Sequence, residues 1–316
     1  MSDNNHSKQL IPSPSSLPEI KKVDSLIGIT TNLIQDNIEQ MFNKAFCLLN
    51  NKYKITEGIN YYHIFEEGHE SILCDERLFN FNKDVKKNTE GVVNSIIYID
   101  PNNYLAYILK GIASRDTNIV FDKYHGWNNT QFGKINIEDF SRAITICSKS
   151  FAAYYWRGFA YFQNEEYELA SDDFSKVLEI CPNIANAYYW LGNVKSELKD
   201  HEGAIYNYSK VIELDPNQDR AYIKRGEYRQ GDEDWDGANE DFTNAINANP
   251  NNFDAYYKRA FLIEHFFFDW EEALADYTKG FEIRYKFEKD EGWWHRIEYD
   301  FYSKKELLNL LISHQK

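Results

Sequence analysis

The stretch YYWRGFAYFQNEEYELASDDFSKVLEICP at residues 154–182 returns in altered form at residues 188–216 as YYWLGNVKSELKDHEGAIYNYSKVIELDP. Both copies open on an aromatic pair, carry a glycine at the fifth position and close on a proline, and they start 34 residues apart. A fixed period of this length indicates a chain built from stacked copies of one small unit. Such a chain grows by adding units rather than by enlarging a single core.

The same spacing continues on both sides of these two copies. The glycine position is filled every 34 residues by Gly158, Gly192, Gly226 and Ala260. Later in each unit come a small residue and an aromatic four positions on, as Ala170 and Phe174, Ala204 and Tyr208, Ala238 and Phe242, and Ala273 and Tyr277. Pro182, Pro216 and Pro250 close three units, and the last unit holds one extra residue.

This combination of an aromatic, a glycine, a later alanine, a second aromatic and a closing proline resembles the tetratricopeptide repeat (TPR). The resemblance covers residues 88–281. It implies that each unit is a pair of helices, A and B, that cannot bury its apolar face without a neighbour. The expected fold is therefore all-α, a right-handed superhelical solenoid of TPR-like helical hairpins.

The residue types at the repeated positions have physical reasons. Glycine inside a helix costs about 1 kcal/mol against alanine, so we expect helix B to approach helix A closely there, with the repeated alanines as the small residues opposite. Asp200, Asp234 and Asp269 are expected N-caps of three B helices. The closing prolines are expected to end the B helices, because the residue before proline avoids the helical conformation.

The period divides the chain into four parts. Residues 1–22 are expected to form a disordered N-terminal tail, and residues 285–316 a C-terminal capping helix. Residues 88–284 are the expected repeat array, with an insertion near 115–134 that makes one unit 13 residues too long. Residues 23–87 are either an irregular helical N-terminal extension or a degenerate repeat, and the pattern leaves both open.

Two further positions vary together from unit to unit. The residue before the helix A glycine position is Lys110, Arg157, Leu191, Arg225 and Arg259 in turn. The residue before the helix B aromatic is Asp139, Asp173, Asn207, Asp241 and Asp276. The one unit without a cation is also the one without an acid, which predicts an ion pair between helices in the other four.

The TPR resemblance implies a binding groove lined by the A helices. The candidate peptide-binding residues are Tyr155, Phe159, Tyr189, Asn193, Arg220, Lys224, Tyr257 and Lys258. Aromatic side chains with nearby cations favour an extended acidic or aromatic peptide. The alternative is that several of these aromatics belong to the core of the repeats. The carboxylate clamp of chaperone-binding TPR proteins is matched on one helix only, at Arg220 and Lys224, so that standard clamp is absent.

Charge and composition narrow the classes of partner. The 316 residues carry 35 Lys+Arg against 50 Asp+Glu, a formal net charge of -15, which disfavours nucleic acid and anionic membranes. No apolar run is long enough for a membrane span or a signal-peptide core, so we expect a cytoplasmic protein. Nucleotide and dinucleotide motifs are missing, and no cofactor or catalytic residue is expected.

Two alternatives to a non-catalytic protein-protein interaction scaffold stay open. Residues 61–84 could form a small enzymatic or metal-binding site, because His63, Glu67 and His69 lie close together there. Their spacing is not that of a known zinc motif, and the two histidines would lie on different faces of a helix. The third possibility is a structural subunit that self-associates through its ends.

Overall fold

The computed structural model describes residues 83–114, 137–288 and 301–306, together with positions 35, 38–41, 43, 45, 308, 309, 312 and 313. Over these residues the regular structure is helical and there is no strand. None of the described helices is both long and apolar enough to cross a membrane. The all-α prediction is therefore confirmed.

The helices follow one another in the pairs that the period predicts. In chain order they are α3 (Lys83–Ile99), α4 (Tyr104–Ala113), α5 (Ile137–Ile146), α6 (Phe151–Gln163), α7 (Tyr167–Ile180), α8 (Ala185–Glu197), α9 (His201–Leu214), α10 (Asp219–Gly231), α11 (Trp235–Ala248), α12 (Phe253–Leu262), the π-helix η4 (Ile263–Phe267) and α13 (Trp270–Glu288). Helices α4, α6, α8, α10 and α12 are the A helices, and the next α-helix after each is its B helix. The expected insertion lies between α4 and α5, outside the described residues.

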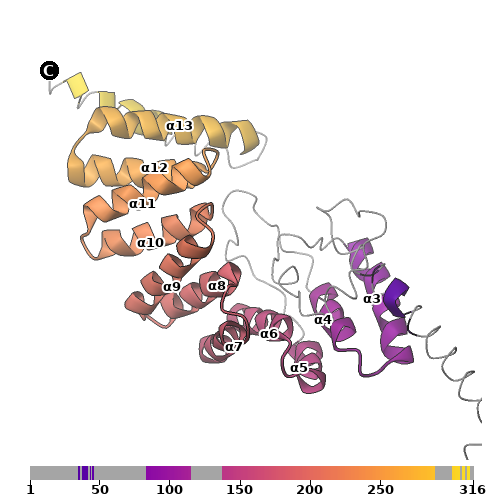
Figure 1. Cartoon of the computed structure of the whole chain (residues 1–316). Helices are drawn as coiled ribbons and strands as arrows, with labels where there is room; N and C mark the ends of the chain where they lie inside the picture. The colour runs from indigo at the N-terminus through magenta and orange to yellow at the C-terminus, as the bar shows by residue number, and fades with distance from the viewer. Residues whose placement is uncertain are drawn as a thin grey trace, which may run out of the picture.

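Each helix packs against the next along the chain, and the array curves (Figure 1). Helix α6 also contacts α4 and α8, so A helices of successive units meet each other. Figure 1 shows α6 and α8 on the inner side of the curve, with α7 and α9 on its outer side. At these two units the inner side of the curve is therefore formed by A helices. The handedness of the superhelix stays a prediction.

The helix ends agree with the chemistry of the repeated positions. The side chains of Asp200, Asp234 and Asp269 accept hydrogen bonds from the backbone N–H groups three residues on, each at 3.0 Å. These bonds satisfy donors that the first turn of a helix leaves unpaired. Helices α7, α9 and α11 each end two residues before a closing proline. The predicted caps and helix ends are confirmed.

The prediction about what faces the helix A glycines was wrong in one respect. The ring of the helix B aromatic, rather than the small alanine, lies against the glycine. A Cβ built on Gly192 would come within 2.7 Å of Tyr208 Cε1, and one on Gly226 within 2.8 Å of Phe242 Cε1. The glycine is needed because a flat ring from helix B occupies the volume of its missing side chain.

The C-terminal end of the array is closed by apolar contacts from later residues. Phe301 stacks on Phe281 of α13 with ring centroids 4.0 Å apart, and Leu308 is fully buried in the same cluster. Lys304 forms an ion pair with Glu264 of η4 at 2.6 Å. These contacts are those of a capping segment, while the limits of the four predicted parts stay a prediction.

Candidate functional site

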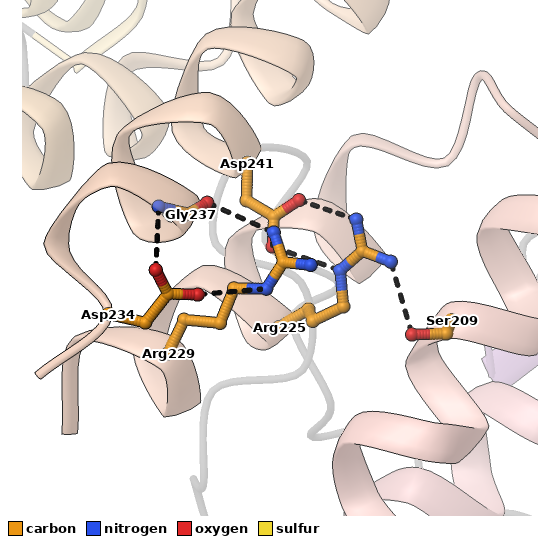
Figure 2. A network of polar contacts seen from close by, with 6 residues as sticks. All are labelled: Ser209, Arg225, Arg229, Asp234, Gly237 and Asp241. Atoms are coloured by element: carbon orange, nitrogen blue, oxygen red, sulfur yellow. Dashed lines mark hydrogen bonds and ion pairs between the residues drawn. The ribbon is translucent and has the colours of Figure 1, made fainter. Parts of the chain in front are cut away.

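The covarying cations and acids form ion pairs between the A and B helices of one unit. Figure 2 shows the pair of the fourth unit, α10 and α11: Arg225 Nε donates to Asp241 Oδ2 at 2.9 Å, and Nη2 donates to Oδ1 at 2.6 Å. The third nitrogen, Nη1, donates to the hydroxyl of Ser209 at 3.1 Å, on helix B of the preceding unit. One guanidinium therefore joins both helices of its own unit to the unit before.

The same arrangement recurs in two other units. Arg157 holds Asp173 by two bonds of 2.7 and 2.8 Å and reaches Ser141 of the preceding unit at 3.3 Å. Arg259 holds Asp276 at 2.7 and 2.8 Å and reaches Thr243 at 3.1 Å. In the first unit, Lys110 makes a single contact of 3.1 Å with Asp139. The prediction of four ion pairs is confirmed.

The unit without the pair replaces it with an uncharged bond. The amide nitrogen of Asn207 donates to the backbone carbonyl of Gly203 at 2.7 Å, within helix B. Asn207 is buried, and an aspartate there would face Leu191 rather than a cation. Removing both charges together avoids an unpaired buried carboxylate, which explains why the two positions vary together.

The hydroxyl partners of the arginines were missed at the level of sequence, although a signal was present. The residue directly after the helix B aromatic carries a hydroxyl in these units, as Ser141, Ser209 and Thr243. This position recurs with the repeat period.

Asp241 also forms an ion pair with Arg229, at 3.2 Å from Nη1, while Nη1 donates a hydrogen bond to the carbonyl of Gly237 at 3.1 Å (Figure 2). Arg229 Nε lies 3.8 Å from Asp234 Oδ2. Burial lowers the pKa of Arg225, but the hydrogen bond and charge of Asp241, together with Tyr222 and Glu240, leave it raised, so the guanidinium stays charged. The contacts of this network connect α9, α10 and α11.

Two of the predicted groove residues do not reach a surface. Tyr155 and Phe159 are fully buried. The Tyr155 ring packs edge-on against Phe174, and Phe159 packs edge-on against Trp190 of the next A helix at 4.8 Å between centroids. Their assignment to a peptide groove is therefore corrected: they are core residues, because the aromatic rings of α6, α7 and α8 fill the space between those helices.

The predicted groove lysines meet at one glutamate. Lys224 Nζ lies 3.0 Å from Glu227 Oε2 on α10, and Lys258 Nζ of α12 lies 2.7 Å from Glu227 Oε1. The side chains are exposed by 42% for Lys224, 31% for Glu227 and 32% for Lys258. We call these three residues the lysine–glutamate bridge. It links successive A helices.

The charges of the bridge shift the pKa values of its members. Desolvation is the largest influence on Lys224 and lowers its pKa, but the charge and hydrogen bond of Glu227, together with Tyr189 and Asp254, leave the pKa raised. Desolvation likewise raises the pKa of Glu227, yet the two lysines bring it below its ordinary value.

Two predicted groove residues of α8 lie beside helix B of their own unit. Tyr208 of α9 donates its hydroxyl hydrogen to Asn193 Oδ1 at 2.8 Å, and the Tyr189 ring lies 6.0 Å from the Tyr208 ring. Tyr189 and Asn193 are both half-buried. Burial raises the pKa of Tyr208 well above its ordinary value, so this phenol remains a hydrogen-bond donor.

The remaining two predicted groove residues lie on the last two A helices. Tyr257 of α12 packs toward α13, where a Cβ on Gly280 would come within 3.2 Å of its ring. Arg220 lies near the start of α10, and both side chains are half-buried. The structure therefore places six of the eight predicted residues at partly exposed positions of α8, α10 and α12, and the lysine–glutamate bridge brings two of them together.

The alternative sites receive no support from the residues that the structure describes. His63, Glu67 and His69 lie outside them, so the proposed metal site there is untested. Within the described ranges, no group of three or more His, Cys, Asp or Glu side chains is arranged to hold a metal ion. Cys147 and Cys181 are free and half-buried.

Comparisons with known proteins agree with the repeat. A family model described as "Tetratricopeptide repeat" matches residues 151–184 and 185–218, which include both copies of the opening stretch. A structure described as "Functional Characterization of Pseudomonas Aeruginosa pilF" is 10% identical, with 84% of this chain and 99% of that chain covered and a TM-score of 0.54. This likeness concerns the fold alone.

Two other structures share less of the shape. YrrB, "a TPR protein with an unusual peptide-binding site", is 20% identical over 61% of this chain and 92% of that chain, with a TM-score of 0.45. A MamA structure from Desulfovibrio magneticus RS-1 is 23% identical over 48% and 85%, with a TM-score of 0.44. The search of curated proteins finds no match.

Proposed function

We propose that this chain, two units of which match the tetratricopeptide repeat model, is a non-catalytic scaffold whose inner face binds a peptide or a partner helix. TPR arrays in general act as protein-interaction modules, which supports the scaffold role. The partner's contact segment is acidic or aromatic. A cytoplasmic location, and the lack of nucleic-acid and membrane partners, belong to the same proposal.

The lysine–glutamate bridge is the observation that carries this proposal. It links two successive A helices, α10 and α12, and its three side chains are partly exposed. Two ammonium groups share one carboxylate, so the bridge itself keeps a net positive charge. A carboxylate from a ligand would gain two cations that are already oriented by their bonds to Glu227.

Ligand binding at the bridge is an exchange of carboxylates. Glu227 lowers the gain from an incoming acid, because each lysine must loosen its present contact before it takes a new one. The side chain also holds Lys224 and Lys258 in place, which reduces the rotamer entropy that a ligand must overcome. Tyr189 and Tyr257 on neighbouring A helices supply the aromatic contacts for the same segment.

The experiment measures binding of a fluorescein-labelled peptide of alternating glutamate and tyrosine by fluorescence anisotropy with the full chain. The double variant Lys224→Ala/Lys258→Ala removes both cations and should weaken binding at least tenfold, which corresponds to about 1.4 kcal/mol. Glu227→Gln keeps the shape of the side chain and removes the competing charge. It should therefore strengthen binding, by roughly threefold to tenfold.

A matched control exists on the outer side of the array. Lys210 and Glu213 form a pair three residues apart on α9, with a contact of 2.6 Å, as Lys224 and Glu227 do on α10. Lys210→Ala and Glu213→Gln should leave peptide binding unchanged. Loss of binding in the α9 variants to the same degree as in the α10 variants would mean that net charge, not the inner face, governs the affinity, and the proposal would be wrong.

A further inference from the structure

The last unit departs from the others where helix A turns into helix B. Ala273 follows Ala260 by 13 positions, while the equivalent pairs of the three preceding units are 12 positions apart. The extra residue is taken up by η4, a π-helix at Ile263–Phe267 that directly follows α12. A π-helix absorbs one residue by widening a turn and is frequently found at functional sites.

The turn after η4 also uses an unusual residue. The connections between helices A and B contain a residue with positive φ in four units, namely Glu165, Lys199, Glu233 and Phe268, with φ values of 64°, 63°, 62° and 59°. The first three are charged, while the fourth is a phenylalanine that is 61% exposed. A bulky side chain is disfavoured at positive φ, and this one is not buried, so neither the turn nor the core explains it.

Phe268 belongs to a group of exposed aromatic side chains. Phe266 is 38% exposed and Phe267 40% exposed, and the Phe266 ring stacks on Trp235 of α11 with centroids 3.8 Å apart. We call these four residues the aromatic turn. Because the stack joins the turns of two successive units, the aromatic surface extends across both.

The surroundings of the aromatic turn are acidic. Asp232, Glu233 and Asp236 are exposed and lie within three residues of Trp235. Asp269 follows Phe268 and is exposed, as is Glu272 one turn later. An apolar surface with this rim repels acidic segments and anionic membranes, and it attracts cations.

We infer that the aromatic turn is a second docking surface that binds a basic amphipathic segment of a partner protein, in which apolar side chains are flanked by lysine or arginine. The apolar side chains cover Phe267 and Phe268. The flanking cations meet the carboxylates of the rim and the faces of the phenylalanine rings. This surface is separate from the lysine–glutamate bridge, which favours the opposite charge.

The test uses three fluorescein-labelled helical peptides with the full chain. The first has leucines on one face and alternating lysine and arginine on the other. In the second, glutamate replaces every basic residue, and in the third, serine replaces every leucine. The first peptide alone should bind measurably, and its affinity should fall as salt is raised, because the rim contributes by charge.

Two variants locate the binding on the protein. Phe267→Ser/Phe268→Ser removes the exposed rings and leaves the Trp235 stack, and it should weaken the first peptide at least tenfold. Glu233→Lys/Asp236→Lys reverses part of the charge of the rim and should weaken binding of the first peptide by a similar factor. Tyr98→Ser is the matched control, since Tyr98 is an aromatic residue 88% exposed on α3, and it should have no effect.

Three outcomes would overturn the inference. Equal binding of the leucine and serine peptides would mean that net charge alone causes the binding. Unchanged affinity in Phe267→Ser/Phe268→Ser would place the peptide elsewhere on the protein. A mass in light scattering that rises with protein concentration and reverts to a monomer in that variant would assign the turn to a second copy of the chain. Thermal unfolding by circular dichroism checks that each variant is folded. The variant Lys224→Ala/Lys258→Ala should still bind the basic peptide, so a failure of this inference can be told apart from a failure of the proposed peptide groove.

Discussion

The pair Arg225–Asp241 should be energetically coupled by about 2 kcal/mol, measured by a double-mutant cycle. The structure provides the substitutions, because the neighbouring unit has Leu191 and Asn207 at the same two positions. The cycle therefore consists of Arg225→Leu, Asp241→Asn and the two combined. The combined variant reproduces a pair of residues that this chain already tolerates in an equivalent place.

The magnitudes follow from the burial and bonds of each partner. Asp241 is fully buried, accepts two hydrogen bonds from Arg225 and forms an ion pair with Arg229 at 3.2 Å. Removing one partner of a buried pair costs about 3–5 kcal/mol of stability. Arg225→Leu should cost about 3 kcal/mol, the lower end of this range, because Arg229 still provides a cation for Asp241. Asp241→Asn should cost about 2 kcal/mol, since charged hydrogen bonds contribute about 1.5–3 kcal/mol and Arg225 keeps its bond to Ser209. With coupling, the double variant should lose about 3 kcal/mol rather than the sum of the two.

The assay is urea denaturation followed by circular dichroism, with the same cycle made at Lys110 and Asp139 as the control. Lys110 is 34% exposed and makes a single contact, whereas Arg225 is 15% exposed and makes two. The Lys110–Asp139 coupling should therefore stay below about 1 kcal/mol, as for exposed pairs. Equal coupling in the two cycles would refute the reasoning, because burial and the bidentate geometry would then make no difference.

Three further changes have defined outcomes. Gly192→Ala should destabilise the protein by about 1 kcal/mol more than Gly158→Ala in the same assay, because the new Cβ would come within 2.7 Å of Tyr208 in the first case and no closer than 3.1 Å to any neighbour in the second. Phe268→Gly should raise the free energy of unfolding by about 0.5–1 kcal/mol by relieving the positive φ, whereas Phe268→Ala, which keeps a Cβ, should not. The lysines lower the pKa of Glu227 against its desolvation, so its contribution to stability should be present above its ordinary pKa of about 4.3 and be lost as the pH falls through the lower, folded value. Urea titrations at a series of pH values should show a weaker acid dependence for Glu227→Gln.

The repeat period predicts which positions belong to the proposed binding face, but not which of their side chains remain exposed. Tyr155 and Tyr189 occupy equivalent positions one period apart, yet Tyr155 is fully buried and Tyr189 is half-buried. Both tyrosines contact the ring next to them in the chain and the helix B aromatic of their own unit, Trp156 and Phe174 for Tyr155, and Trp190 and Tyr208 for Tyr189, so these repeated contacts do not account for the difference. Burial depends on residues of several helices at once, and the pattern within one unit does not report it.

The sequence by itself determined what repeats. A period of 34 residues specifies the helix pairs, the N-caps and the ion pairs, because each relation recurs at the same spacing and the exception at Leu191 and Asn207 changes both partners together. Only the tertiary structure decided what occurs once: the sharing of Glu227 by two lysines from successive A helices, and the π-helix that places Phe268 on the surface. The physical reason is that stacked units obey local rules that a single unit already contains, whereas the shape and charge of the face between units depend on side chains that meet only after stacking.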